Sequence, residues 1–472
     1  MPPERFTLLT TANKDELSQE DRKIRQSIQW IGDALLHRRF HEVSSELSEA
    51  TRALQAVATG FFDNLQQTKN EALLLLAMNQ EAPLVMWHTK RSPATVPHSD
   101  RFGSMGVNCG VLALPKGNAH AGISIWGGLT HENGHHIVDG IPKLMENIKG
   151  AVEKALDPKG LAGIDEHFRK HFVASSKEIA CDVLALLDGG PAFVLSLLST
   201  LEAERGGTLS CRGSYFGDDK AILKDLVLIE GKNKLAVSTG LSDVQIPGES
   251  GVFGRRILPR KRKSPSAASV AAKSGDEEPV MRYRKFKYSD GHPVDVSRVL
   301  VLQALLNKIA TKPELKGQID AVIDAAIDKA MGADGMIRLE YVDYEADGTT
   351  LVVKQHEYPI GAMRRAAVAI GDAIAHTKFE ALNEETLCEV FPWAAEDNLA
   401  VENLQEQLSR EGDLATPPPG GTKALTSYIL SAAILNSCKE DGNVERAFAR
   451  MKKFLVQVAD RPQEHAGAGL LV

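Results

Sequence analysis

The chain has 472 residues, with 55 Lys or Arg, 62 Asp or Glu and a net charge of −7. This length exceeds what one compact core usually holds, and the acidic balance argues for a soluble protein and against nucleic-acid binding by the whole chain. The five cysteines are scattered without a C-x-x-C pair. They predict neither a disulfide framework nor a zinc ribbon, and they favour a reducing cytoplasm.

Apolar spacing in the first hundred residues predicts helical segments over 24–36, 43–57 and 61–76. Short apolar runs with glycines then predict strands over 83–87 and 106–114. A further run, Ala121 to Trp126, alternates apolar and small residues and predicts a strand that leads into the next helix. A free strand edge at this place would pair with an extended peptide, although the sequence leaves open which run forms the edge.

The stretch His131-Glu132-Asn133-Gly134-His135 has the form H-E-x-x-H. On a helix, two histidines four positions apart share one face, with the glutamate beside them. Two imidazoles so placed can bind zinc, and the carboxylate can act as a general base toward water. His136 is rotated about 100° away, so we expect a supporting or surface residue there rather than a ligand.

The third ligand decides the class of such a site, because a catalytic zinc usually has three protein ligands and one open position. A metzincin needs Gly and His at fixed offsets after the second histidine, and Val138 and Ile141 stand there instead. The helix predicted over 174–187 carries Glu178 and Asp182, which are four positions apart. We predict that Glu178 binds zinc and that Asp182 accepts the ring N–H of a ligand histidine.

Two other interpretations of this region stay open. Ser175-x-x-Glu178 has the form of a capping box, which would hold the glutamate at its own helix end. His167 and His171 form another i, i+4 pair that could supply the third ligand, or could simply lie on a surface helix.

No stretch is predicted to span a membrane, and residues 1–11 lack the apolar core of a signal peptide. The longest apolar run, 183–201, is interrupted by Asp188-Gly189-Gly190-Pro191 and predicts two buried helices joined by a turn. Residues 247–280 are rich in Gly, Ser, Ala, Pro and charge, which predicts a disordered linker. Its basic cluster, Arg255-Arg256 with Arg260 to Lys263, is the one stretch where we consider a nucleic-acid contact or a localisation signal, and a solvated tether is the simpler interpretation.

Three motifs occur in the order found in gluzincin metallopeptidases: His131-Glu132-x-x-His135, Glu178-x-x-x-Asp182 and His292-Pro293-x-x-x-x-Arg298. The last is similar to that of HtpX-type and CAAX-prenyl-type proteases. The resemblance implies that His292 donates to the oxyanion of the transition state, and that Arg298 orients Glu178 or Asp182 or holds the substrate. Three tyrosines are unplaced alternatives for the oxyanion role: Tyr215, Tyr283 and Tyr288. Those families are membrane-embedded, and in this respect the sequence departs from them.

The predicted fold is α+β and mostly helical, with a small sheet next to the H-E-x-x-H helix of a zincin-like core. The predicted regions are an N-terminal helical region (1–100), the catalytic core (101–246), the linker (247–280), a continuation of the core (281–310) and a helical C-terminal domain with a β-hairpin over 338–344 and 350–356 (311–472).

The predicted function is a zinc-dependent peptidase, of endopeptidase type, that acts on a peptide or protein substrate. The alternative is a catalytically silent interaction or regulatory protein stabilised by zinc. Glu132 argues against this alternative, because a structural zinc site needs no general base. A peptidase that cleaves a repressor is a third possibility, but no helix-turn-helix pattern supports it. The oligomeric state stays open.

Overall fold

A computed structural model describes residues 45–89, 93–96, 108–157, 161, 163–215, 293–332, 334–344, 351–415, 422–439 and 442–460, together with 21, 24–25 and 28–35. This part of the chain is α+β and mostly helical, as predicted. The predicted linker over 247–280 and His292 lie outside it.

The chain forms two compact units. The first comprises Met1–Gly213, Gly291–Leu339 and His356–Val472, and the second comprises Ser214–Asp290 and Glu340–Gln355. The motif helices and Arg298 belong to the first unit. The division of the chain into five regions, which the sequence predicts, stays a prediction. Among the described helices, none has both the length and the apolar character that a membrane crossing requires.

A three-stranded mixed sheet has the order β1-β3-β2, with β1 (Glu81–His88) parallel and β2 (Ala94–Val96) antiparallel to β3 (Cys109–Pro115). The predicted strands over 83–87 and 106–114 are confirmed. The edge strand β2 was not predicted, since three residues are too few to show an alternating pattern.

The central strand β3 is buried along its whole length. Its side chains alternate between two faces, as in any strand. Val111 and Ala113 pack with Ala34, whereas Leu112 and Leu114 pack in the core that contains Trp87.

Helix α6 (Ile123–Gly140) follows β3 after the short 3-10 turn η2 (Lys116–Ala119). The strand predicted over 121–126 is therefore wrong. Ile123, Trp126 and Leu129 recur every three residues and are buried on one side of α6. A six-residue window of alternating residues fits both this helical pattern and a strand, and only packing separates the two.

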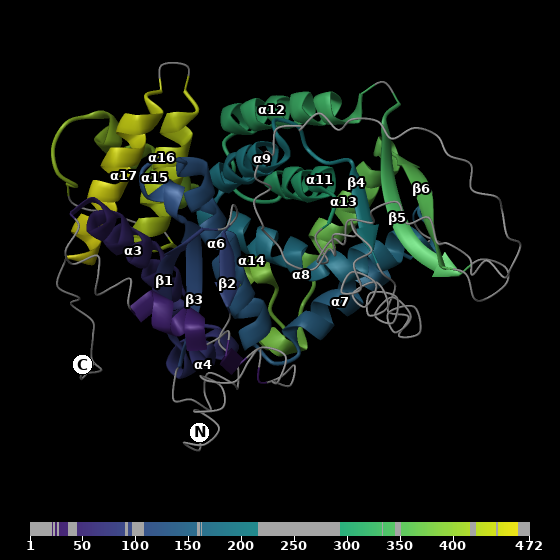
Figure 1. Cartoon of the computed structure of the whole chain (residues 1–472), viewed down its shortest axis with the longest axis horizontal. Coiled ribbons are helices and arrows are strands. Elements are labelled where there is room, and N and C mark those ends of the chain that lie inside the picture. Colours follow the sequence, from purple (N-terminus) through teal and green to yellow (C-terminus); the bar gives the residue numbers. More distant parts are fainter. Residues whose placement is uncertain are drawn as a thin grey trace, which may run out of the picture. The chain divides into compact units, whose positions relative to one another are not determined.

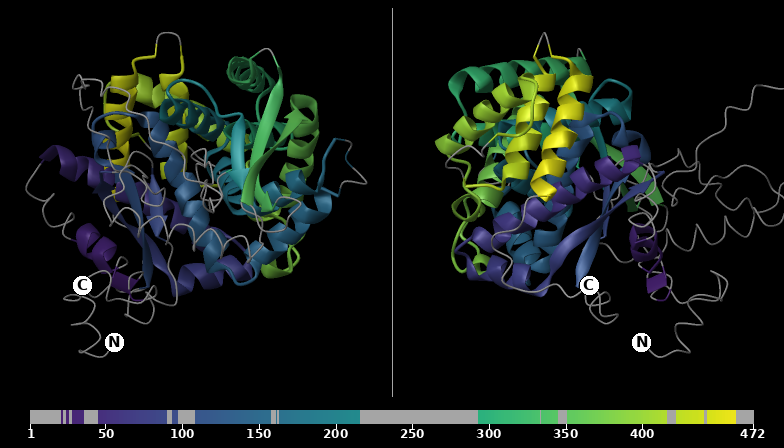
Figure 2. Two further views of the ribbon diagram at one scale, coloured as in Figure 1. Left: turned by 45° about the vertical axis from the view of Figure 1, so that its right-hand side comes forward. Right: turned by 90° about the vertical axis from the view of Figure 1, so that its left-hand side faces the viewer.

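The long helix α3 (Ser45–Gln67) runs through the gap expected between 57 and 61, and α4 (Glu71–Asn79) follows it. Figures 1 and 2 show α3, near the purple end of the colour scale, beside the yellow helices α16 and α17, with which it packs. These helices and the sheet share one hydrophobic core with the first half of α6. The C-terminal helices of this group are α15 (Ala395–Ser409), α16 (Leu425–Ser437) and α17 (Val444–Ala459).

A second core holds Ile137 and Val138 from the last turns of α6. The end of α3 and helix α4 also belong to this core. Its further helices are α7 (Leu144–Ala155), α8 (Glu166–Gly189), α9 (Pro191–Arg205), α11 (Asp295–Leu306), α12 (Pro313–Met331) and α13 (Ile360–Ala375), with the short elements η3 (Glu380–Leu382) and α14 (Leu387–Val390). The two buried helices predicted within 183–201 are confirmed as the end of α8 and the start of α9. Helix α6 thus runs from one core into the other.

The hairpin strands predicted near 338–344 and 350–356 are confirmed as β5 (Met336–Tyr344) and β6 (Leu351–Pro359). They form a second sheet of order β4-β5-β6 with β4 (Arg212–Tyr215).

Candidate metal centre

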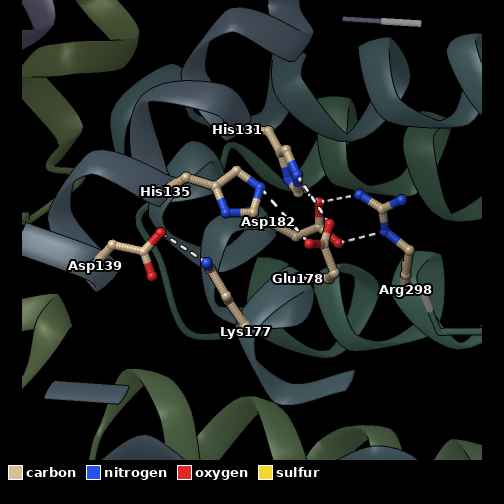
Figure 3. A network of polar contacts seen from close by, with 7 residues as sticks. All are labelled: His131, His135, Asp139, Lys177, Glu178, Asp182 and Arg298. Carbon is tan, nitrogen blue, oxygen red and sulfur yellow. Dashed lines mark hydrogen bonds and ion pairs between the residues drawn. The ribbon is translucent and has the colours of Figure 1, made fainter. Parts of the chain in front are cut away.

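Helices α6 and α8 approach each other closely at Gly134, inside the H-E-x-x-H motif. A Cβ atom on this residue would lie 3.0 Å from Cys181 Cα and 3.2 Å from its carbonyl oxygen, closer than side chains pack. Only glycine therefore allows this crossing without movement of the α8 backbone. The crossing brings the acidic residues of α8 opposite the histidines of α6 (Figure 3).

Three side chains converge at the crossing. Glu178 Oε2 lies 3.4 Å from His131 Nε2, and Glu178 Oε1 lies 3.7 Å from His135 Nε2. Four ligands about 2.0 to 2.1 Å from a tetrahedral zinc would stand roughly 3.3 Å apart, which is close to these separations. Both separations are longer than a well-formed hydrogen bond. The spacing therefore suits ligands that share one ion.

The chemistry of the three donors also fits zinc. Two imidazole nitrogens and one carboxylate oxygen are the His₂Glu ligand set of catalytic zinc sites. In the described part of the chain, His131, His135 and Glu178 form the one group of three possible metal ligands, with all donor atoms within 4.8 Å of one another. The side chains of His131 and Glu178 are only 9% and 14% exposed. Water therefore competes little with a metal ion for their donor atoms.

Asp182 and Arg298 support this group from one side. Asp182 Oδ1 accepts a hydrogen bond from His131 Nδ1 at 2.8 Å, which leaves Nε2 as the nitrogen that faces Glu178. Arg298 donates from Nε to Asp182 Oδ2 and from Nη2 to Oδ1, each at 2.7 Å. This two-pronged contact is buried, and its paired hydrogen bonds fix the relative orientation of the two groups. Of the roles considered for Arg298, the structure shows contact with Asp182.

The electrostatics of the two histidines differ. Burial lowers the pKa of His135 to about 3, and the charge of His131 acts in the same direction. Burial also opposes charge on His131, but the charge of Asp182 and its hydrogen bond outweigh this and raise the pKa of His131 to about 10. In the metal-free protein His131 therefore holds a proton on each nitrogen at neutral pH, and a metal bound at Nε2 would displace one of them.

The pKa of Asp182 is lowered although its burial alone would raise it, because Arg298 and His131 both favour its charged form. The pKa of Arg298 is raised by the same pairing, against the effect of burial. Both groups therefore remain ionised at neutral pH. A charged Asp182 keeps the proton of His131 on Nδ1, which is what a ligand histidine requires.

The capping-box interpretation of Glu178 is wrong. Helix α8 begins at Glu166, where the Asp165 side chain accepts a hydrogen bond from the Phe168 amide at 2.9 Å. Ser175 lies well inside the helix and is buried. Its spacing from Glu178 has no connection with a helix end.

His167 and His171 lie nearer the other end of α8 and outside the ligand group. The ring of His167 contacts that of His356, with centroids 4.8 Å apart. His171 is fully buried and packs edge-on against Phe172. Seven residues separate His171 from Glu178, which corresponds to about 10 Å along a helix.

The neighbours of the motif on α6 have separate roles. His136 is buried, and its Nε2 lies 3.0 Å from Thr95 Oγ1 on β2, so it supports the sheet and lies outside the ligand group. Glu132 is partly exposed, whereas residues 133–138 are buried. Glu132, the residue expected to act as the base, is thus not sealed in the core as its neighbours are. His292, Tyr283, Tyr288 and the side chain of Tyr215 lie outside the described residues, and their roles stay predictions.

Sequence reasoning missed one ion pair beside the group. Lys177 Nζ lies 2.7 Å from Asp139 Oδ2, which joins α8 to α6 (Figure 3). The two residues are 38 positions apart, and no local pattern links them. The one feature of the sequence that could have pointed to Asp139 is its place one helical turn after His135, on the same face of α6.

Comparisons with protein-family models, with curated proteins and with solved structures found no match for this chain. The resemblance to gluzincins therefore stays a prediction from three short motifs. Any functional conclusion has to come from the site itself, because a fold alone does not define an activity.

Proposed function

We propose that this protein is a zinc-dependent peptidase whose metal is held by His131, His135 and Glu178. The observation that carries the proposal is the convergence of these three donors at separations suited to a shared zinc, with the partly exposed Glu132 next to His131 in the motif. A purely structural zinc site would need neither an open ligand position nor a neighbouring base.

Zinc in this site would supply a Lewis acid that lowers the pKa of water and polarises a peptide carbonyl. Glu132 takes a proton from the attacking water and passes it to the leaving amine. Asp182 holds the Nδ1 proton of His131, so that Nε2 stays available as a ligand. Arg298 fixes the carboxylate of Asp182 through two hydrogen bonds.

The proposed substrate is an extended peptide that pairs with β2. This strand is at the edge of its sheet, and Thr95 joins it to His136 of the motif helix. An edge strand presents backbone donors and acceptors, which bind a peptide of any sequence. Strand pairing beside α6 would bring a peptide bond near Glu132.

Glu132→Gln tests this proposal. We expect peptide hydrolysis to fall by about 10³-fold, the usual contribution of a general base, while one zinc per chain is retained. The measurements are metal analysis and cleavage of a proteome-derived peptide library, with Glu314→Gln on the exposed face of α12 as the matched control. Full activity of Glu132→Gln would refute the assigned role. A wild-type protein that binds one zinc but cleaves no peptide would support the catalytically silent alternative.

A further inference from the structure

The ion pair between Asp139 and Lys177 lies on the side of the ligand group opposite Arg298 (Figure 3). The Nζ–Oδ2 distance is 2.7 Å, and the two side chains point toward one another from α6 and α8. Both are partly exposed, at 30% for Asp139 and 36% for Lys177. The pair therefore joins the two helices at the margin of the site.

The position of each partner in its helix links the pair to the metal ligands. Asp139 follows His135 by four residues on α6, so the two side chains share one face of that helix. Lys177 directly precedes Glu178 on α8. The ion pair thus ties α6 to α8 within one helical turn of His135 and next to Glu178.

A carboxylate paired with a cation lies on each side of the ligand group (Figure 3). His131 is oriented by Asp182, a carboxylate that is itself held by the cation Arg298. Near His135 the carboxylate is Asp139, and the cation that holds it is Lys177. Asp182 hydrogen-bonds a ligand histidine directly, whereas Asp139 is related to His135 only by its place one helical turn further along α6.

We propose that Asp139 and Lys177 are a positioning pair that sets the separation of His135 and Glu178 in the metal-binding conformation. This inference rests on the proposed metal site. Because the pair is partly exposed, its effect is smaller than that of a buried partner, and we expect its loss to raise the Zn²⁺ dissociation constant about two- to fivefold. The geometry around the ion should change as well, because the two helices are then free to shift at this end of the site.

The test compares Asp139→Asn, Lys177→Gln and the charge-swapped double variant Asp139→Lys/Lys177→Asp with the wild type. Zn²⁺ affinity is measured by competition with a chelator, and ligand geometry is measured from the visible absorption of the Co²⁺-substituted protein. We expect both single variants to bind Zn²⁺ more weakly with an altered Co²⁺ spectrum, and the charge swap to restore both. Circular dichroism of each variant verifies that it is folded.

The matched control is the pair of Arg169 and Glu153, which joins the same helix α8 to α7 at 3.1 Å and is also partly exposed. Arg169→Gln should leave the Zn²⁺ affinity and the Co²⁺ spectrum unchanged. Single variants of the positioning pair that keep the wild-type affinity and spectrum would overturn the inference. Equal losses in Arg169→Gln would also overturn it, since the pair would then only stabilise α8. A wild-type protein that binds neither Zn²⁺ nor Co²⁺ would instead refute the metal site itself, and the inference with it.

Discussion

Helix α8 contributes to two buried polar clusters that differ in kind. One surrounds Asp182 at the metal centre, and the other surrounds Asp188 near the end of the helix. Asp182 and Asp188 are both 1% exposed. Burial is therefore the same at the two places and does not distinguish a functional site from a structural one. The pKa values differ, because Arg298 and His131 lower the pKa of Asp182 against the effect of burial, whereas burial raises the pKa of Asp188.

The Asp188 cluster is closed by hydrogen bonds within the protein. Asp188 accepts from Asn64 Nδ2 at 2.7 Å and from Ser427 Oγ at 3.1 Å. Nearby, Asp397 accepts from the hydroxyl of Tyr428 and from the amide of Thr422. These contacts join α3, α8, α15 and α16, and buried polar groups satisfied in this way stabilise one packing arrangement.

The Asp182 cluster instead leads to three donor atoms. Arg298 holds Asp182, and Asp182 holds His131, whose Nε2 faces Glu178 at 3.4 Å. The donors are spaced as ligands of one ion, beyond good hydrogen-bonding distance. What separates the two clusters is thus the spacing of their donor atoms. Variants in the Asp182 cluster should change zinc binding. Variants in the Asp188 cluster should change stability alone.

The largest effect is expected for Arg298→Met. This change leaves Asp182 buried without its cation, which should lower the free energy of unfolding by about 3 to 5 kcal/mol. Zinc affinity should also fall, by about 10- to 100-fold, because Asp182 no longer has a fixed orientation beneath His131. Urea unfolding and zinc titration measure the two effects. Lost stability with unchanged zinc affinity would place Arg298 with the structural cluster.

Glu178→Ala removes a proposed ligand. A structural zinc site provides roughly 10 to 16 kcal/mol through four ligands, or about 3 kcal/mol for each. We therefore expect the zinc dissociation constant to rise by about 100-fold or more, measured by competition with a chelator. A fully metallated and active variant would assign the third-ligand role to a residue other than Glu178.

Asp188→Ala is the corresponding change in the second cluster. Asn64 and Ser427 lose their shared acceptor, so the free energy of unfolding should fall by about 2 kcal/mol. Zinc affinity should stay at the wild-type value, because Asn64 and Ser427, the hydrogen-bond partners of Asp188 among the described residues, lie outside the ligand group. A weaker zinc site in this variant would show that the two clusters are coupled through α8.

The smallest effect concerns pH. Burial lowers the pKa of Lys423 from 10.5 to about 8, although Asp188 and Asp397 act in the opposite direction. Between these values the unfolded chain binds this proton and the folded chain releases it, so the contribution of Lys423 to stability rises with pH. From pH 8 to pH 9 the difference in unfolding free energy between the wild type and Lys423→Met should change by about 1 kcal/mol in favour of the wild type. A constant difference would contradict the lowered pKa, and zinc affinity of the variant serves as the control.

Elements with a clear local pattern were predictable. Strands β1 and β3, the two buried helices joined at Gly190, and the hairpin strands β5 and β6 all follow from apolar spacing and turn residues. The errors came where the local pattern was ambiguous or too short. Residues 121–126 fit a strand and a helix equally well, and β2 is only three residues long.

The sequence by itself determined that His131 and His135 share one face of a helix, and that Glu178 and Asp182 share another. These relations depend on the 3.6-residue repeat of a single helix, which acts over four positions. Only the tertiary structure decided that Asp182 meets His131 across 51 positions, that Arg298 reaches Asp182 across 116, and that Lys177 pairs with Asp139. Such contacts depend on how α6 and α8 cross, and that crossing is set by the close approach at Gly134 and by packing in shared cores.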